Sequence, residues 1–219
     1  MPAIDAAGWP KLRELCAVDE GLHPAYGLHP MYLSSHRPQH LHELREWLQR
    51  ELPVAVGECG LDFFVDDLDP ATQRDYFLRQ LELAKEFDLP VVLHARRAVE
   101  EVIAHLRRIG GLRGVVHSYS GSLEQARQLF DLGFCLGFGG PITYERARRL
   151  REIVVQMPLE FLLLETDAPD QPLSTHRGER NEPAYLPEVL KVAAALRGES
   201  EASVAAATSA NARRLFGLY

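Results

Sequence analysis

Short apolar runs alternate with longer amphipathic stretches along this chain of 219 residues. Runs rich in Val, Leu and Phe are typical of buried parallel strands, and apolar residues at helical spacing are typical of packed helices. Strands are predicted at 24–29, 53–57, 89–93, 114–116, 134–138 and 161–164, and helices at 9–15, 41–52, 70–84, 99–106, 123–132, 147–154, 186–196 and 200–216. This alternation forms parallel βαβ units, which predicts an α/β fold of the TIM-type (β/α)8 barrel class in a single domain, residues 1–219.

Local signals fix the ends of several predicted helices. Asp69 followed by Pro70 has the residue types of an N-cap and a first helical position. Ser122 and Gln125 have the spacing of a capping box. Gly133 is the expected residue just past the end of that helix.

Glu58, His94, His117 and Asp167 each close one of the apolar runs. In a closed barrel the C-terminal strand ends converge on one face, where such barrels keep their active sites. Carboxylates and imidazoles suit Mg²⁺, Mn²⁺ or Zn²⁺ as ligands. One histidine after an apolar run is more often a satisfied strand-end residue, but four such residues on four strands predict a metal site. A metal-dependent hydrolase follows, with Glu58 and Asp167 as catalytic residues.

Three neighbouring polar residues are predicted to support this site. Arg96 lies two residues after His94, and its planar guanidinium suits a phosphate; a surface arginine is the alternative. Glu165 lies two residues before Asp167 and is predicted to hold a ligating histidine, because an unpaired buried carboxylate is costly. Asn181 is a candidate substrate contact, with a helix N-cap as the alternative.

Two further residues near strand ends stay outside the predicted ligand set. Asp62 is interpreted as a turn residue rather than a ligand. His29, which precedes Pro30 at a strand end, is a candidate pocket residue only.

Composition narrows the class of protein without identifying a substrate. The net charge of −7 argues against a protein that coats duplex nucleic acid, because such proteins carry a basic surface. It does not exclude an enzyme that handles one phosphodiester at a time, because a bound divalent cation supplies local positive charge. Cys16, Cys59 and Cys135 match no usual zinc or redox spacing, which favours reduced thiols. The sequence has no apolar stretch of membrane-spanning length and no signal-peptide pattern, so a cytoplasmic location is expected.

Five ordered motifs resemble signatures of the TatD family of metal-dependent hydrolases, and the resemblance runs from about residue 2 to 217. They are 57–62 (GECGLD), 93–96 (LHAR), 117–121 (HSYSG), 164–169 (LETDAP) and 180–183 (RNEP), followed by Asn211 and Phe216. The pair at 96–97 and the residues 168–170 are most similar to the YjjV-like branch of the family.

The resemblance implies a deoxyribonuclease of exonuclease type that hydrolyses phosphodiesters with water activated at two divalent cations. Nucleic acid, and DNA in particular, is the implied substrate. In this arrangement Glu58 bridges the two cations, His94 and His117 complete one site, and Asp167 serves the other.

The family pattern opens with a strand that carries His-x-His, and no such pair precedes the motif at 27–30 (GLHP). We therefore expect a barrel without its first strand and helix, as a misplaced start or a truncated copy would leave it. Two ligands of the Asp167 cation would then be missing, while the other site keeps three.

Two other functions remain open. One is hydrolysis of a small ester or amide on the same scaffold, which fold alone does not separate from nuclease activity. The other is a truncated pseudoenzyme of low activity that acts as a binding partner. Phosphate-binding groups such as Arg96 favour the nuclease, and the presence of all four predicted ligands speaks against the pseudoenzyme.

Overall fold

The structure is a computed structural model that describes residues 1–218. Within this range its strands are β1 (Ala25–Tyr26), β2 (Ala55–Asp62), β3 (Val91–Arg96), β4 (Gly114–Val116), β5 (Phe134–Phe138) and β6 (Leu162–Leu164). The α-helices are α1 (Trp9–Val18), α2 (Pro38–Glu51), α3 (Pro70–Glu86), α4 (Val99–Ile109), α5 (Leu123–Asp131), α6 (Arg148–Gln156), α7 (Leu186–Arg197) and α8 (Glu201–Phe216). Short 3₁₀ helices span Ala6–Gly8, Pro30–Ser35, Gly140–Thr143, Leu159–Phe161, Ser174–His176 and Pro183–Tyr185.

The strands follow the order β1-β2-β3-β4-β5-β6 in the sheet, which is the chain order. The pairs β1–β2, β2–β3 and β5–β6 are parallel. Pro2 adds an isolated parallel bridge to Ala25, so the segment before α1 lies beside β1. The predicted order of strands and helices is confirmed, but β1 is shorter than the apolar run at 24–29. In addition, β2 and β3 continue past their predicted ends at 57 and 93, to Asp62 and Arg96, so Glu58 and His94 lie within strands and not after them.

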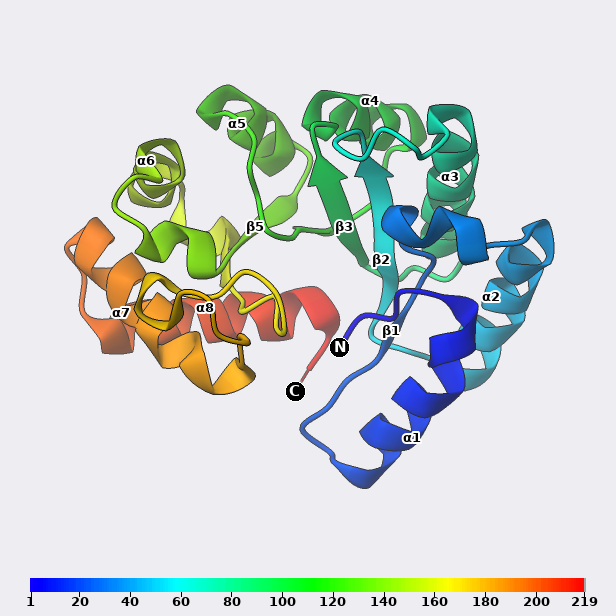
Figure 1. The fold of residues 1–219 in the computed structure, drawn as a ribbon, viewed down its shortest axis with the longest axis horizontal. Helices are drawn as coiled ribbons and strands as arrows, with labels where there is room; N and C mark the ends of the chain where they lie inside the picture. Colours follow the sequence, from blue (N-terminus) through cyan, green and yellow to red (C-terminus); the bar gives the residue numbers. More distant parts are fainter. Residues whose placement is uncertain (219) are drawn as a thin grey trace. The chain divides into compact units, whose positions relative to one another are not determined.

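The chain divides into two compact units, Met1–Val115 and the part from Val116 onward. In the first unit α3 packs along β2 (Figure 1). Asp69 caps α3 as predicted, because its carboxylate accepts a hydrogen bond from the amide of Thr72 at 2.8 Å. The apolar face of α3 is buried in the core of this unit.

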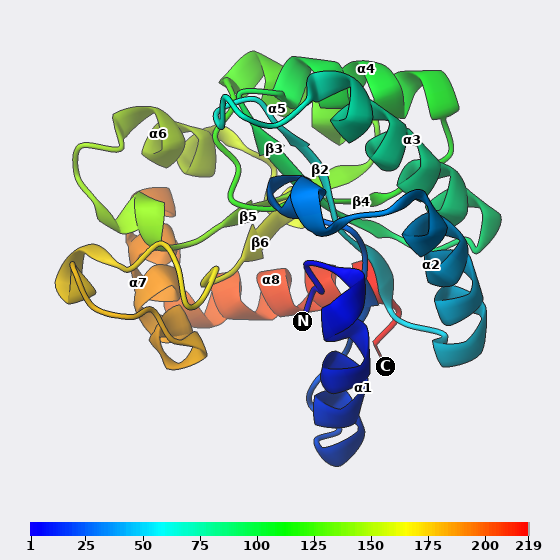
Figure 2. The same cartoon turned by 45° about the vertical axis from the view of Figure 1, so that its right-hand side comes forward.

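In the second unit α8 packs against β6, and α7 packs against α8 (Figure 2). Asn211 on α8 donates from Nδ2 to the carbonyl oxygens of Leu159 and Leu162, at 2.8 and 2.9 Å. The capping box of Ser122 and Gln125 at the start of α5 is confirmed. The Asn211 hydrogen bonds attach α8 to the start of β6, whereas the capping box fixes only the start of α5.

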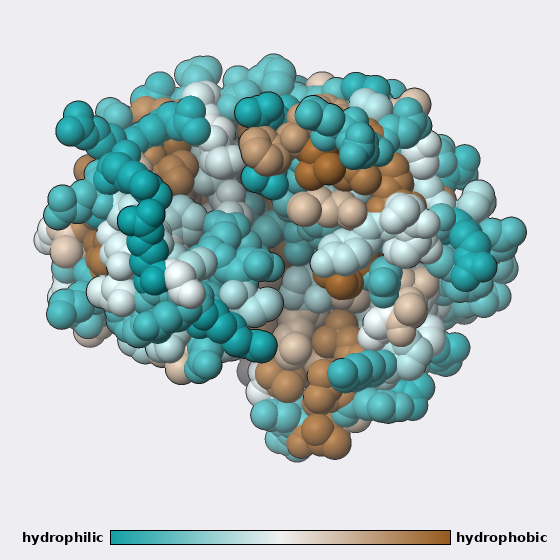
Figure 3. Space-filling model, in the orientation of Figure 1, coloured by the Kyte–Doolittle hydropathy of each residue, from teal (hydrophilic) through white to brown (hydrophobic). Residues whose placement is uncertain are grey.

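The surface of α1 is rich in apolar atoms (Figure 3). Val18 is 84% exposed and Leu15 is 42% exposed. Residues 1–218 include no helix that is both long and apolar enough to cross a membrane. The cytoplasmic location stays a prediction.

Candidate active site

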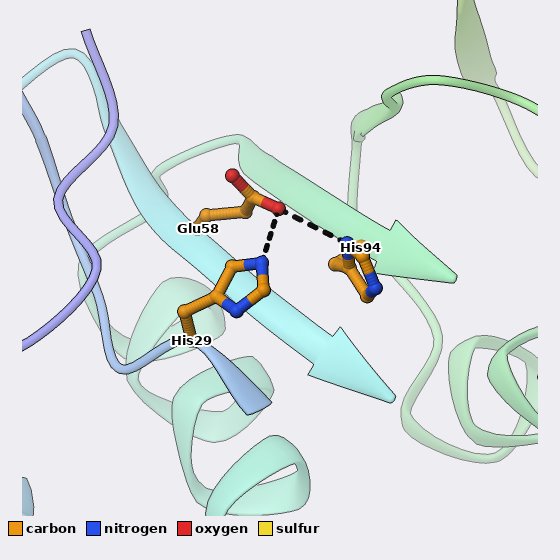
Figure 4. A group of neighbouring side chains, drawn as sticks. All are labelled: His29, Glu58 and His94. Carbon is orange, nitrogen blue, oxygen red and sulfur yellow. Dashed lines mark hydrogen bonds and ion pairs between the residues drawn. The ribbon is translucent and has the colours of Figure 1, made fainter. Parts of the chain in front are cut away.

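Three side chains from neighbouring elements of the first unit meet around one carboxylate (Figure 4). Oε1 of Glu58 in β2 lies 2.7 Å from Nε2 of His29, which follows β1, and 3.2 Å from Nδ1 of His94 in β3. His29 and Glu58 are both buried, with 6% and 7% of their surface exposed. The carboxylate therefore faces two imidazoles out of bulk solvent.

The backbone of β2 explains why Glu58 and His94 approach each other. The register of β2 against β3 shifts between Val56 and Cys59, so one extra residue of β2 is accommodated where Glu58 lies. Bulges of this kind turn side chains and are common beside active sites. Glu58 and Asp62 are four residues apart on one face of the strand, and Gly60 between them pairs with His94.

Gly60 is required for this close approach of the two strands. Its φ is +148°, and a Cβ atom there would lie 1.9 Å from the carbonyl oxygen of His94. No side chain fits in that space. The GECGLD motif thus encodes both the acidic residues and the gap into which His94 fits.

The other ring nitrogen of His94 binds Asp62. Nε2 of His94 lies 2.9 Å from Oδ2 of Asp62, which is fully buried. Oδ1 of Asp62 accepts hydrogen bonds from the amides of Phe64 and Val65, at 2.9 and 3.2 Å. Burial raises the pKa of Asp62, but the hydrogen bonds from His94 and from these amides outweigh burial and lower the pKa below its ordinary value. Asp62 is therefore a charged carboxylate that orients His94.

Gln73 of α3 fixes the backbone of Asp62 from the other side. Its Nε2 donates to the carbonyl oxygen of Asp62 at 2.9 Å, and its Oε1 accepts from the amide of Asp62 at 2.8 Å. Gln73 is itself 1% exposed. The position of the carboxylate is thus set by buried hydrogen bonds rather than by a mobile loop.

These contacts fit a divalent cation at the Glu58 carboxylate. His29, Glu58 and His94 each offer one potential ligand atom, and these three atoms lie within 4.8 Å of one another. The amide of Met31 donates to Nδ1 of His29 at 3.1 Å, so the ring proton of His29 is on Nε2 and points to Glu58. Because Nε2 of His94 binds Asp62, Nδ1 is the ring nitrogen that would bind a cation at Glu58. A buried carboxylate beside an imidazole is suitable ligand chemistry for Mn²⁺ or Zn²⁺.

The second unit gathers His117, Glu165 and Asp167 at the ends of β4 and β6. Nδ1 of His117 lies 3.8 Å from Oε1 of Glu165 and 3.8 Å from Oδ1 of Asp167. Oε1 of Glu165 also accepts a hydrogen bond from the amide of Ser118 at 2.5 Å. Gly137 in β5 makes room for this carboxylate, because a Cβ there would lie 2.2 Å from Oε2 of Glu165. Glu165 therefore lies beside His117. That it holds a ligating histidine stays a prediction.

Asp167 has a left-handed backbone, with φ of 56°, and its loop is held by side-chain amides. Gln171 donates from Nε2 to Oδ2 of Asp167. Asn181, 1% exposed, donates from Nδ2 to the carbonyl oxygens of Thr166 and, at 2.8 Å, Asp170. Strained backbone of this kind is maintained only where surrounding contacts enforce it.

The predicted residues therefore fall into two groups. Glu58 and His94 meet in the first unit, and His117, Glu165 and Asp167 meet in the second. That all of them serve one catalytic centre stays a prediction. Arg96 is exposed at the end of β3.

Asn181 stays a predicted substrate contact, but its amide is already used in holding the Asp167 loop. Asp62 was interpreted as a turn residue, and its Oδ1 does accept hydrogen bonds from the amides of the turn that follows. Its contact with His94, and the contact of His29 with Glu58, were missed. The motifs GLHP and GECGLD contain these residues, but only strand register shows what they touch.

Residues 1–217 match the model of the family described as TatD related DNase. The metal-dependent hydrolase YjjV of Escherichia coli (strain K12) is 42% identical over 223 residues, which cover 100% of this chain and 85% of YjjV. The 3'-5' ssDNA/RNA exonuclease TatD of Klebsiella pneumoniae (strain 342) is 39% identical over 203 residues, which cover 88% of this chain and 76% of that protein. The crystal structure of YjjV, a TatD homolog from Escherichia coli K12, has a TM-score of 0.96 at 40% identity and covers 100% of this chain and 86% of that one.

The match to YjjV extends over the whole chain in both sequence and structure. The predicted fold class, a TIM-type barrel of the metal-dependent hydrolase group, is confirmed by this likeness and by the order of the strands. The predicted likeness to YjjV is confirmed as well. The His, Glu and His cluster agrees with the metal dependence of these relatives. The chain therefore belongs to the TatD family of metal-dependent hydrolases.

Proposed function

We propose that this protein is a divalent-cation-dependent nuclease that hydrolyses phosphodiester bonds of single-stranded DNA from an end of the strand. The observation that carries the proposal is the buried Glu58 carboxylate beside His94, whose other ring nitrogen binds Asp62. Membership of the TatD related DNase family supports the reaction class. The name of the Klebsiella relative, a 3'-5' ssDNA/RNA exonuclease, supports single strands and cleavage from an end.

In this proposal the cation ligands are Glu58 and His94 in the first unit and His117 and Asp167 in the second. Two cations are expected for a complete set of ligands, and Mg²⁺, Mn²⁺ and Zn²⁺ all suit the mixture of carboxylates and imidazoles. A bound cation polarises a phosphoryl oxygen and lowers the pKa of water enough for it to attack at neutral pH.

The side chains have separate tasks in this reaction. Asp62 keeps the proton of His94 on Nε2, and His29 donates to Oε1 of Glu58, so both residues orient a ligand. Gln171 holds Oδ2 of Asp167, and the Asp167 carboxylate would accept a proton from the attacking water once cations are bound. Glu165 positions His117.

The test uses chelator-treated protein to which Mg²⁺, Mn²⁺ or Zn²⁺ is returned one at a time. Single-stranded DNA labelled at the 5′ end in one reaction and at the 3′ end in another reports the order in which products appear. Cation-dependent release of mononucleotides from one end is the expected result. Glu58→Gln is the inactive control, and matched RNA and double-stranded DNA measure the preference for substrate.

Two outcomes would contradict the proposal. Rapid hydrolysis of an aryl ester, with DNA left intact under every cation, would favour a hydrolase of small esters or amides. Cation binding without hydrolysis of either substrate would favour the pseudoenzyme. Internal cuts in DNA would keep the nuclease and overturn cleavage from an end.

A further inference from the structure

Two arginine side chains lie against one exposed aromatic ring beyond the end of β3. The central guanidinium carbon of Arg96 lies 3.6 Å from the ring centre of Phe64, and that of Arg97 lies 4.6 Å from the same centre. Phe64 is 44% exposed, and both arginines are exposed. Attraction between a cation and the face of an aromatic ring holds each guanidinium in place without consuming its N–H donors.

Neither guanidinium has an anionic partner among residues 1–218. Other arginines of the first unit that lie over aromatic rings are neutralised. Arg74 lies over Phe63, but its guanidinium makes two hydrogen bonds to the carboxylate of Glu101. Arg45 over Phe87 is bound to Glu86, and Arg50 over Trp47 is bound to Glu51. Arg96 and Arg97 instead keep two positive charges and their hydrogen-bond donors available at one place.

The loop that carries Phe64 is anchored to the candidate metal centre. The amide of Phe64 donates to Oδ1 of Asp62, whose Oδ2 binds His94. The amide of Phe63 donates to the carbonyl oxygen of Arg96 at 2.9 Å, which ties this loop to the end of β3. These hydrogen bonds therefore fix the positions of the Phe64 ring and the two arginines relative to His94.

The backbone of β3 places Arg96 on the side of the strand that carries His94, because residues two apart share a face. Arg97 follows with φ of 55°, a left-handed conformation that non-glycine residues rarely adopt. Such conformations are concentrated at active sites and ligand clamps. Asp66 and Asp67 come later in the same loop, and neither forms an ion pair with these arginines in the described part of the chain.

We propose that Arg96 and Arg97, held by Phe64, form a clamp for a backbone phosphate of single-stranded nucleic acid next to the phosphodiester that is cleaved. The inference rests on the proposed nuclease function. A guanidinium binds phosphate through paired N–H donors, and two guanidiniums prepared in advance lose little conformational entropy when the phosphate binds. Arg96 and Arg97 contact the substrate, and Phe64 is a positioning residue.

The experiment measures two quantities for each variant: binding of a fluorescent single-stranded oligothymidylate in chelator by anisotropy, and hydrolysis with Mn²⁺. Arg96→Gln and Arg97→Gln should each weaken binding and raise KM about tenfold, with kcat little changed, because each removes charged hydrogen bonds made in the ground state and the transition state alike. The slope of log affinity against log salt should fall by roughly 0.7 for each phosphate that the variant no longer neutralises. Phe64→Leu should act in the same direction, and Phe64→Tyr, which keeps the ring, should restore binding.

Two controls separate the clamp from general damage. Arg74→Gln removes an arginine whose charge is already paired and should leave binding unchanged. Hydrolysis of a small diaryl phosphate, which has no neighbouring phosphate, should fall much less in the clamp variants than hydrolysis of the oligonucleotide. An oligonucleotide with hydroxyl groups at both ends should bind as tightly as one with a terminal phosphate.

Several outcomes would overturn the clamp. The clamp would be rejected if Arg97→Gln or Phe64→Leu bound the oligonucleotide with wild-type affinity and wild-type salt dependence. The proposed nuclease function would still stand in that case, provided that wild type cleaves DNA. Equal loss of diaryl phosphate hydrolysis would show damage to the metal centre instead. Binding that needs a terminal phosphate would reject a backbone phosphate as ligand. If wild type cleaves no DNA, the proposed function fails, and the binding measurements still decide the clamp.

Discussion

His94 donates a hydrogen bond from Nε2 to Oδ2 of Asp62, 2.9 Å away, and Asp62 is fully buried. The contact follows from the register of β2 and β3, which places His94 opposite Gly60 and between Glu58 and Asp62. It determines which ring nitrogen of His94 is left for a cation. The same carboxylate holds the loop that begins at Phe64, so one buried group orients both a proposed ligand and a proposed substrate-binding loop.

Asp62→Asn should weaken cation binding or hydrolysis by about 10- to 100-fold, the usual cost of removing a residue that orients a ligand. The carboxylate accepts hydrogen bonds at both oxygens, whereas an amide would turn its NH₂ group toward a donor on one side. Calorimetric titration of chelator-treated protein with Mn²⁺ measures the effect. Asp66→Asn, in the exposed part of the same loop, is the matched control. Unchanged affinity and rate in Asp62→Asn would reject the orienting role.

Gly60→Ala should destabilise the first unit by more than about 3 kcal/mol, because the new Cβ would meet the backbone of His94 and the residue must keep a positive φ. Urea unfolding followed by circular dichroism gives the free energy of unfolding. Gly111→Ala also has a positive φ, 72°, but has open space around it and should cost only about 1 kcal/mol. Equal costs at the two positions would show that the close strand approach does not require Gly60.

Asn181→Ala should lower stability by about 1–3 kcal/mol and reduce kcat, because the carbonyl oxygens of Thr166 and Asp170 would lose their buried donor and the Asp167 loop would loosen. Thermal unfolding and steady-state kinetics together check this. Arg180→Ala, at the exposed neighbouring position, is the control. A raised KM with unchanged stability and kcat would instead make Asn181 the substrate contact that the sequence predicts.

The pair of His176 and Glu188 should make stability depend on pH. The hydrogen bond at 2.8 Å between them raises the pKa of His176 and lowers the pKa of Glu188. Because its pKa is raised in the folded state, His176 contributes stability that is fully present below about pH 6.5. This stabilisation is lost as the pH rises through the folded-state pKa of His176. Because its pKa is lowered in the folded state, Glu188 contributes stability that is fully present above about pH 4.3. This stabilisation is lost as the pH falls through the folded-state pKa of Glu188.

His176→Asn should therefore reduce the melting temperature most between about pH 4.3 and pH 6.5, and less on either side of that window. A series of thermal melts against pH measures the difference from wild type. His23→Asn, whose side chain makes no ion pair in the described range, is the control. A difference that grows above pH 8 would contradict the assignment.

Local signals in the sequence were sufficient for the starts of α3 and α5 and for the order of strands and helices. Asp69 and Ser122 cap their helices through side chains that reach only three residues along the chain, so sequence spacing alone determines them. The apolar runs of β2 and β3 were equally clear, because short buried runs of Val and Leu are typical of parallel strands, but both strands continue past these runs to Asp62 and Arg96.

The contacts within the candidate site depended on pairing between strands, which sequence spacing does not contain. The register shift around Glu58 and the close approach at Gly60 place His94 between two carboxylates. His29 reaches Glu58 only because β1 pairs with β2. For the same reason Asp62 was interpreted from its local turn, and its contact with His94 was missed.

Glu58 is inferred to be a cation ligand in a metal-dependent phosphodiesterase. The most direct measurement is the rate of single-stranded DNA hydrolysis by chelator-treated wild type and Glu58→Gln as Mn²⁺ is added. We predict that wild type is inactive without cation and recovers as Mn²⁺ binds, whereas folded Glu58→Gln stays at least about a thousandfold slower, equivalent to roughly 4 kcal/mol of activation free energy. Near-wild-type turnover by Glu58→Gln, or hydrolysis that persists in chelator, would rule out this role of Glu58.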